Sequence, residues 1–412
     1  MKKHTSWWLV LLLLFPAGLL AQDKGVHFEH GLTWAQIQSK AKTENKYIFI
    51  DCFTSWCGPC KMMAQIVFPQ EVAGDFFNKN FISVKMQMDK TAADDPNIKL
   101  LYDDAAEIEK DYHVVAYPTF LFFAPDGHIV HRITGGEFPA SEFVKEATGA
   151  LDTLKQYYTL MQNYDTNPNI DPEEIRKLAL LADRNYDQIL SGKLATAYLA
   201  TQPTIYTKKN VEFLCLLTKS SNDKSFEAFL NRPDKIDSVM GKGAAAQKIQ
   251  DIALQDDYVN TGIKAIPDWK AKQSALEVKY PGYSKEIIAR FKIQYYLSEK
   301  NWNELTPAMK GYLSLYGSDI SLAEMDGIAQ AIFDNCPDKN CLQVALEWSK
   351  IAKEKGFMSS DITYASLLYK IGDQKTAIKF IEIIVKNMNF SDGSLQEQLD
   401  KMKKGEKIWT NP

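Results

Sequence analysis

The chain has 412 residues, with 48 Lys and Arg against 52 Asp and Glu, and a formal net charge of −4. Hydrophobic residues make up 45% of it and charged residues 24%, which excludes a wholly disordered chain and a polytopic membrane protein. The mild acidity and the lack of a long basic run argue against a nucleic-acid binder. This length predicts two or three domains.

Residues 1–21 have the pattern of a secretory signal peptide. Two lysines precede an apolar run over residues 7–20, and Ala21 is a small residue suited to cleavage before Gln22. The run of about 14 residues is shorter than the roughly 20 that cross a bilayer. We therefore predict cleavage and a periplasmic or otherwise secreted protein with no membrane span after cleavage. An uncleaved N-terminal anchor is the alternative.

Residues 22–150 alternate between strand and helix patterns. Short apolar runs predict four strands, at 47–51, 81–86, 119–123 and 129–133. Pro125-Asp126-Gly127 predicts a hairpin turn between the last two strands. Helical patterns follow Pro59, cover 100–110 and begin again at Ser141. This order predicts an α/β domain with a central mixed sheet flanked by helices.

Residues 151–412 have helical patterns throughout. Asp171-Pro172 is typical of a helix start, with a capping residue followed by proline at the first position. Ala345 and Ala377 lie 32 residues apart, close to the 34-residue period of tetratricopeptide repeats. We predict an all-helical, tetratricopeptide-like repeat domain, with an irregular helical bundle as the alternative. Further helices are expected near 193–200, 211–217, 244–254, 284–298, 322–333, 342–351, 362–369 and 376–385.

The motif with the clearest chemistry is Trp56-Cys57-Gly58-Pro59-Cys60, which follows a predicted strand and opens a predicted helix. A helix N-terminus stabilises a thiolate, so Cys57 is expected to have a lowered pKa and to be the exposed, attacking sulfur. Cys60, one turn further on, would resolve the mixed disulfide. A structural disulfide and a zinc half-site are the alternatives. A zinc site would need two more ligands, and we predict no metal.

Distant features agree with this motif. Trp-Cys-Gly-Pro-Cys-Lys, six residues after Asp51, resembles the thioredoxin superfamily, and the similarity covers roughly residues 25–150. The longer spacing, with an extra helix near 100–110, is more similar to the thioredoxin-like module of DsbD-type reductases. The resemblance implies a thioredoxin-like fold and a thiol–disulfide oxidoreductase that needs no cofactor.

The resemblance also assigns roles to single residues. Asp51 would be a buried acid that assists proton transfer at the second cysteine, and Lys85 would accompany it. Pro118 would be a cis proline beside the active site, which would leave the backbone of Tyr117 free to pair with an extended substrate. The predicted substrate-binding residues are Trp56, Gly58, Pro59, Tyr117, Pro118 and Gly135. The alternatives are a strand-end Asp51, a solvated Lys85, a trans Pro118 and a core Trp56.

Four further cysteines are present. Cys52 follows Asp51 and should point to the opposite face of the strand as a buried thiol, while the apolar neighbours of Cys215 predict a core position. Cys336 and Cys341 are too far apart to bridge within one helix. Across a helix–turn–helix junction they could form a structural disulfide, remain two free thiols or have a redox function.

Together these features predict an exported oxidoreductase that reduces protein disulfides through Cys57 and Cys60. In the family, the Gly-Pro dipeptide accompanies reducing potentials. An exported protein cannot draw electrons directly from the cytosol, so the resemblance implies a membrane electron-delivery protein as a partner. The alternative is a helical-repeat binding or adaptor protein, in which the thioredoxin-like domain is a docking or redox-sensing module.

Overall fold

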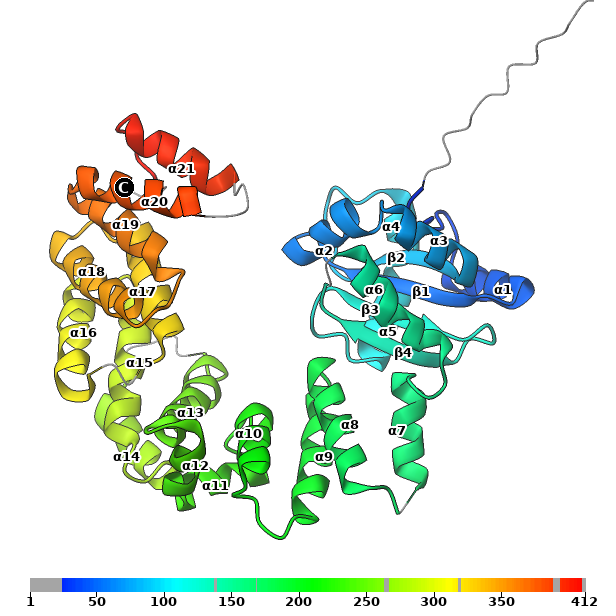
Figure 1. The fold of residues 1–412 in the computed structure, drawn as a ribbon, viewed down its shortest axis with the longest axis horizontal. Coiled ribbons are helices and arrows are strands. Elements are labelled where there is room, and N and C mark those ends of the chain that lie inside the picture. Colours follow the sequence, from blue (N-terminus) through cyan, green and yellow to red (C-terminus); the bar gives the residue numbers. More distant parts are fainter. Residues whose placement is uncertain are drawn as a thin grey trace, which may run out of the picture. The chain divides into compact units, whose positions relative to one another are not determined.

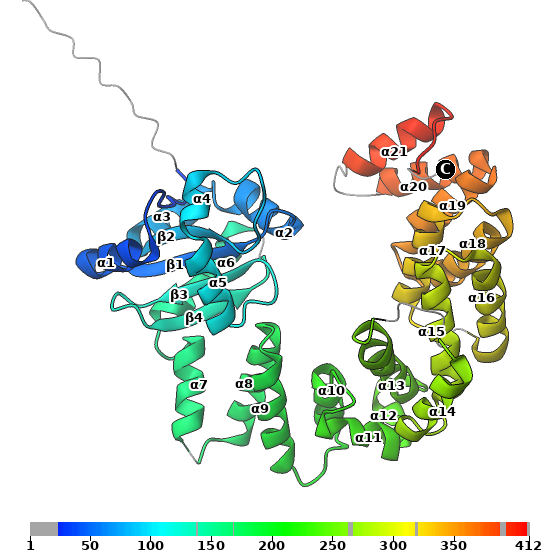
Figure 2. The same cartoon turned by 180° about the vertical axis from the view of Figure 1, so that it is seen from behind.

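A computed structural model describes residues 24–136, 139–167, 169–262, 267–317, 320–387 and 393–409. The predicted signal peptide, residues 1–21, lies outside the described residues. The contacts divide the chain into two compact units, Met1–Thr201 and Gln202–Pro412. Figures 1 and 2 show both units from opposite sides.

The first unit is built on a four-stranded sheet in the order β2-β1-β3-β4. β1 pairs in parallel with β2 and antiparallel with β3, which pairs antiparallel with β4. The predicted mixed sheet is therefore confirmed. The Pro125–Gly127 turn joins β3 to β4, and Ala124 N–H donates to the His128 carbonyl at 2.8 Å. The strands are β1 (Tyr47–Phe53), β2 (Phe81–Gln87), β3 (Thr119–Phe123) and β4 (Ile129–Thr134).

Helices cover both faces of this sheet (Figures 1 and 2). Phe49 on β1 lies in the apolar core under η1, α3 and α6, while Ile50 faces α1 and α5. Alternation along β1 therefore directs Asp51 toward the first face and Cys52 toward the second. The helices are α1 (Trp34–Glu44), α2 (Gly58–Met62), π-helix η1 (Met63–Val67), α3 (Glu71–Asn80), α4 (Pro96–Leu100), α5 (Tyr102–Asp111), α6 (Ala140–Ala147) and 3₁₀-helix η2 (Thr148–Leu151).

Three more helices belong to the first unit: α7 (Tyr157–Thr166), α8 (Pro172–Arg184) and α9 (Gln188–Ala200). The buried Tyr157 donates its backbone N–H to Nδ1 of His131 on β4 at 3.0 Å. Thr134 Oγ1, at the end of β4, donates to the carbonyl of Asn185 at 3.3 Å. The strands thus end before residue 151, as predicted, but the compact unit continues to residue 201.

The second unit has only helices among its described residues, which confirms the predicted helical region. From α17 to α21, helices that follow one another in the chain pack together, and α17 also packs on α19. The helices are α10 (Lys208–Leu217), η3 (Lys224–Phe226), α11 (Glu227–Asn231), α12 (Pro233–Met240), α13 (Ala244–Leu254), η4 (Gln255–Val259), α14 (Trp269–Lys279), α15 (Ser284–Ser298), α16 (Trp302–Tyr316), α17 (Leu322–Asn335), α18 (Lys339–Glu354), α19 (Ser360–Ile371), α20 (Gln374–Asn387) and α21 (Gly393–Lys403).

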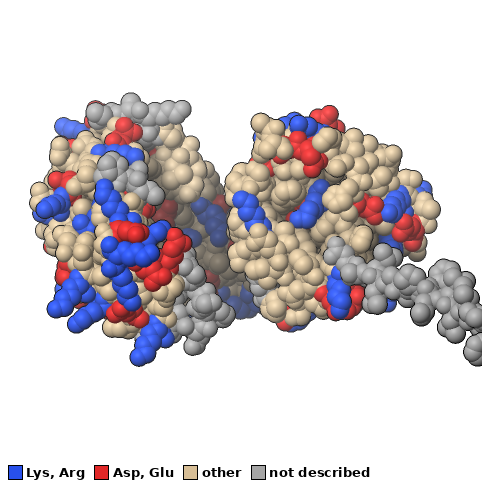
Figure 3. All heavy atoms as spheres, turned by 90° about the horizontal axis from the view of Figure 1, so that it is seen from above, with Lys and Arg blue, Asp and Glu red and all other residues tan. Residues whose placement is uncertain are grey.

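Charges of both signs are mixed on the surface. Lys and Arg alternate with Asp and Glu on the face of the second unit seen in Figure 3. Within the described ranges, no helix combines the length and the apolar character needed to cross a membrane.

A candidate redox site at the start of helix α2

Cys57 and Cys60 form a disulfide at the start of α2, with their Cα atoms 5.3 Å apart. Cys57 is the N-cap of this helix, and its Sγ accepts the backbone N–H of Cys60 at 3.1 Å. Pro59 suits the first turn because a backbone N–H there would have no helical acceptor. The Gly-Pro turn therefore holds the two sulfurs together where the helix leaves its first amides unpaired.

The side chains around the disulfide differ sharply in exposure. Cys57 is only 3% exposed in this disulfide state, so the expected exposed sulfur is not seen, whereas Trp56 is 69% exposed. Gly58 and Pro59 are also exposed. The Trp56 ring meets the Tyr117 ring edge to face, with centroids 6.0 Å apart. Trp56 is thus a rim of the site and not part of the core.

Asp89 holds the loop that leads into the disulfide. Its carboxylate accepts the backbone N–H of Ser55 at 2.8 Å and the Ser55 hydroxyl at 2.5 Å. The sequence prediction missed this residue. A signal was present, because Asp89 follows β2 closely and the carboxyl ends of the parallel strands β1 and β2 lie at the same edge of the sheet.

Asp51 and Lys85 lie opposite each other in the β1–β2 register, and Lys85 Nζ is 3.5 Å from Asp51 Oδ2. Asp51 is 1% exposed, and its Oδ1 has no hydrogen-bond partner among the described residues. Burial raises the pKa of Asp51 to about 6, although Lys85 opposes this shift. The pair predicted from the sequence is therefore in contact. Its buried carboxylate can take up a proton near neutral pH.

The Tyr117–Pro118 peptide bond is cis, as the resemblance implied. The Pro118 carbonyl accepts the backbone N–H of Gly135 at 2.9 Å, which ties the two predicted groove residues together. Gly135 has φ +99°, a conformation that side chains rarely adopt. The Tyr117 hydroxyl donates to Glu109 Oε1 at 2.6 Å. Burial and this carboxylate raise the pKa of Tyr117.

The remaining cysteines lie outside this site. Cys52 is buried on the opposite face of β1, as predicted, and burial raises the pKa of its thiol. Cys215 is only half-buried in α10, so the predicted core position is wrong. Cys336 and Cys341 are both thiols in this structure, so the disulfide that the sequence allowed is not formed here. No group of three or more His, Cys, Asp or Glu in the described part of the chain could hold a metal ion.

Comparison with known proteins places the similarity in the first unit. Residues 34–148 match the thioredoxin-like domain family. Thioredoxin H2-1 of Oryza sativa subsp. japonica is 33% identical over 104 residues, which cover 25% of this chain and 62% of the rice protein. Thioredoxin of Mycobacterium bovis is 31% identical over 123 residues, which cover 30% of this chain and 90% of that protein.

The solution structure of a "putative disulphide-isomerase" from Bacteroides thetaiotaomicron is 35% identical, with a TM-score of 0.27. The match covers 32% of this chain and 98% of that protein. The chain thus spans less than two thirds of the rice thioredoxin and nearly all of the mycobacterial one. The residues matched by the family, 34–148, include Cys57, Cys60, Asp51, Lys85 and Pro118 of this chain.

Proposed function

We propose that this chain, which belongs to the thioredoxin-like family through residues 34–148, is a thiol–disulfide oxidoreductase that reduces protein disulfides. One observation carries the proposal. The Cys57–Cys60 disulfide closes the start of α2, and η1, which continues α2, packs on the face of β1 toward which the buried Asp51 points. A dithiol at this end of the face, with a carboxylate of pKa about 6 buried on it, has the nucleophile and the proton acceptor that disulfide exchange requires.

The reaction begins with the reduced pair. The Cys57 thiolate attacks one sulfur of a substrate disulfide, which breaks that bond and releases the other substrate sulfur as a thiolate. Cys60 then loses its proton with the help of Asp51 and attacks the Cys57 sulfur. The second substrate sulfur leaves, and the Cys57–Cys60 disulfide seen here remains. Two electrons have passed from the protein to the substrate.

The rim of the site supports a polypeptide substrate. Trp56 and Tyr117 form an aromatic edge beside the disulfide, and Val115 is also largely exposed just before the cis-proline loop. An extended chain carrying a disulfide would lie along this edge, where its backbone could pair with that of Tyr117.

Export and electron supply are further parts of the proposal. The apolar N-terminal pattern supports transfer out of the cytosol, with cleavage after Ala21. The oxidised pair must then be reduced again, and we propose a membrane electron-delivery protein for this step. The N-terminal sequence of the protein recovered from the periplasm tests the export, and a start other than Gln22 would contradict the predicted cleavage.

The exchange mechanism can be tested by trapping its intermediate. Cys60→Ser leaves Cys57 without a resolving thiol, so incubation with a disulfide-containing protein should accumulate a mixed disulfide at Cys57, visible on a non-reducing gel. Cys57→Ser is the matched control and should trap nothing. A stable adduct with Cys57→Ser, or none with Cys60→Ser, would contradict the assigned roles.

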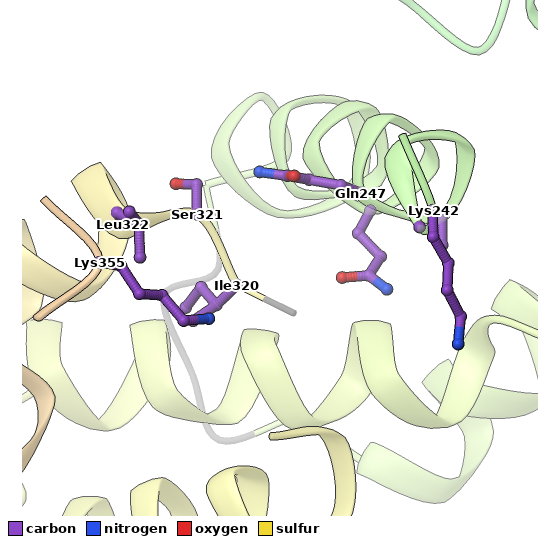
Figure 4. A pocket seen from close by; sticks show the side chains of 9 residues that line it. Lys242, Gln247, Ile320, Ser321, Leu322 and Lys355 are labelled. Carbon is purple, nitrogen blue, oxygen red and sulfur yellow. The ribbon is translucent and has the colours of Figure 1, made fainter. Parts of the chain in front are cut away.

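A cavity in the second unit favours a second candidate function, the binding of a partner. It has a volume of about 620 Å³ and is lined by Lys242, Gln247, Ser321 and Lys355, among others. Lys242 and Lys355 reach it from opposite ends (Figure 4). Two ammonium groups at one cavity suit an acidic segment of a partner. In the proposed enzyme, this unit would select substrates.

Charge reversal tests this candidate. Lys242→Glu with Lys355→Glu should weaken binding of an acidic peptide, measured by calorimetry, and leave the reduction of a small disulfide unchanged. Lys310→Glu, which changes the charge outside the lining of the cavity, is the control. Equal binding by all three proteins would exclude the cavity as the binding site.

A further inference from the structure

The corner between α17 and α18 brings together two buried cysteines from separate helices. Cys336 is the C-cap of α17, and Asp338 is the N-cap of α18. Cys341 is the third residue of α18, and its backbone N–H donates to Asp338 Oδ1 at 2.8 Å. Both cysteines are thiols and both are fully buried. The proposed function uses neither of them.

The two sulfurs are in different electrostatic states. Cys336 Sγ accepts the backbone N–H of Asp338 at 3.4 Å, and it lies 3.8 Å from the Asp338 carbonyl oxygen, to which its thiol can donate. The neighbouring Cys341 thiol lowers the pKa of Cys336, and the Lys370 ammonium acts in the same direction, whereas burial and the Asp338 carboxylate oppose it. The neighbouring Cys336 and burial raise the pKa of Cys341. Cys336, which accepts a backbone N–H, is thus the better nucleophile.

The redox site in the first unit has a similar arrangement. In each pair, the Sγ of the first cysteine accepts a backbone N–H at the start of a helix, from Cys60 in one and Asp338 in the other. In each pair the second cysteine is the third residue of that helix, Cys60 in α2 and Cys341 in α18. A disulfide already joins the first pair. In the second pair, both cysteines contact Asp338 at one corner, and neither is in a disulfide.

From this geometry we propose that Cys336 and Cys341 are a second thiol–disulfide exchange pair, which a disulfide oxidant converts into a reversible bridge across the α17–α18 corner. Cys336 is the attacking sulfur and Cys341 is the resolving sulfur. This proposal does not depend on the chemistry of the first unit.

The exchange can be written with glutathione disulfide as the oxidant. The Cys336 thiolate attacks one of its sulfurs, the glutathione S–S bond breaks, and one glutathione thiolate leaves. Cys341 passes its proton to solvent and attacks the Cys336 sulfur, and the second glutathione leaves. Two protein thiols and one glutathione disulfide thus give one protein disulfide and two glutathione thiols.

Access to the sulfurs requires only a local opening. The residues between the cysteines, 337–340, are all exposed, so the corner itself is at the surface. Short surface segments open far more often than the whole protein unfolds. The exchange should therefore proceed under conditions in which the protein stays folded.

The test uses the full chain carrying Cys57→Ser and Cys60→Ser, treated with glutathione disulfide, alkylated and digested with trypsin. Lys339 lies between the two cysteines, so trypsin separates residues 311–339 from residues 340–350 unless a disulfide joins them. We expect a linked pair that is two hydrogens lighter than the sum of its parts and that dithiothreitol separates. Circular dichroism confirms that the treated protein stays folded.

Two single variants in that background test the assigned roles. Cys341→Ser should accumulate glutathione on Cys336, and the matched Cys336→Ser should leave Cys341 unmodified. Glutathione on Cys341 and not on Cys336 would overturn the roles. If no linked peptides form, Cys336 and Cys341 are not an exchange pair. The same conclusion holds if they link only as fast as the protein unfolds globally in the same buffer. Both measurements are made without the single variants, so they decide the question even where a variant fails to fold.

Discussion

At the scale of single residues, the buried Asp51 distinguishes this site from a structural disulfide. Its carboxylate has a single charged partner, Lys85, and lies under the apolar face of β1. A carboxylate that only stabilised the fold would be expected to have a pKa below its usual range, because its partners would favour the charged form. At Asp51 burial dominates and the pKa rises to about 6. The site therefore holds a charge at some cost in stability.

We predict that Asp51→Asn makes the oxidised protein more stable at pH 7. The pKa of Asp51 is about 6 in the folded protein and 3.8 for an aspartate that is not buried. Between these pH values the folded state binds more protons than the unfolded state, so the protein loses stability as the pH rises through them. This difference in pKa corresponds to a loss of at most about 3 kcal/mol in the free energy of unfolding. Urea unfolding at pH 7 and pH 4 measures the gain, which should nearly vanish at pH 4.

Asp94 provides the matched control for this effect. Hydrogen bonds from Thr91 and Tyr102 hold the pKa of Asp94 below its usual range, so its charge favours the folded state. Asp94→Asn should therefore lower the free energy of unfolding at pH 7. If both variants were destabilised to the same extent, the charge on the Asp51 carboxylate would not destabilise the folded protein.

At the scale of helices and strands, the strands were easier to predict than the helices. β1 and β3 are buried on both faces, so their sequences are nearly continuous apolar runs, and such runs can be recognised in the sequence. The π-helical turn η1 directly after α2 depends on packing over the Phe49 core, so no local pattern predicts it. The helices α1 and α3 were not predicted either.

The chemistry of the site was also only partly predictable. Cys57 and Cys60 follow from a motif, and Asp51 and Lys85 from the resemblance to the thioredoxin superfamily, so their contacts could be expected before the structure. The place of Asp89 just after β2 indicated only that it lies at the same edge of the sheet as the end of β1, and its contact with Ser55 depends on how the loop after β1 meets the end of β2. Long-range contacts of this kind require the fold.

The core behind the site provides a prediction at this scale. Phe49 contacts the rings of Phe77, Phe120, Phe122 and Phe143, so it joins β1 to β3, α3 and α6. Phe49→Ala should lower the free energy of unfolding by about 3–5 kcal/mol, through lost burial and the cavity left behind. Phe49→Leu, which keeps most of the volume, should cost clearly less. Urea unfolding of both variants checks this order, and equal losses would contradict it.

At the scale of the whole molecule, the division between the two compact units lies at another place in the chain than the change in sequence pattern suggested. The sequence changes from α/β to all-helical near residue 151, yet α7–α9 pack with the first unit, which ends at Thr201. Tyr157 is 1% exposed against β4, and Arg184 of α8 pairs with Glu146 of α6. Because β4 is the edge strand, these helices cover a surface that would otherwise be open.

We therefore predict that a fragment of residues 24–201 folds and retains disulfide exchange, whereas a fragment of residues 24–150 is less stable. The loss of the buried Tyr157 alone should cost about 2 kcal/mol, by the burial of one large side chain. Thermal unfolding of the two fragments measures the difference. Equal stability would show that α7–α9 add nothing to the first unit.

The reduction potential of the Cys57–Cys60 pair decides whether this protein is a reductant. Mature protein would be equilibrated in defined dithiol buffers, and the fraction of alkylated Cys57 counted by mass spectrometry. We expect a value near that of thioredoxin, about −270 mV. A value near that of the oxidant DsbA, about −120 mV, would contradict it and make the protein a disulfide donor.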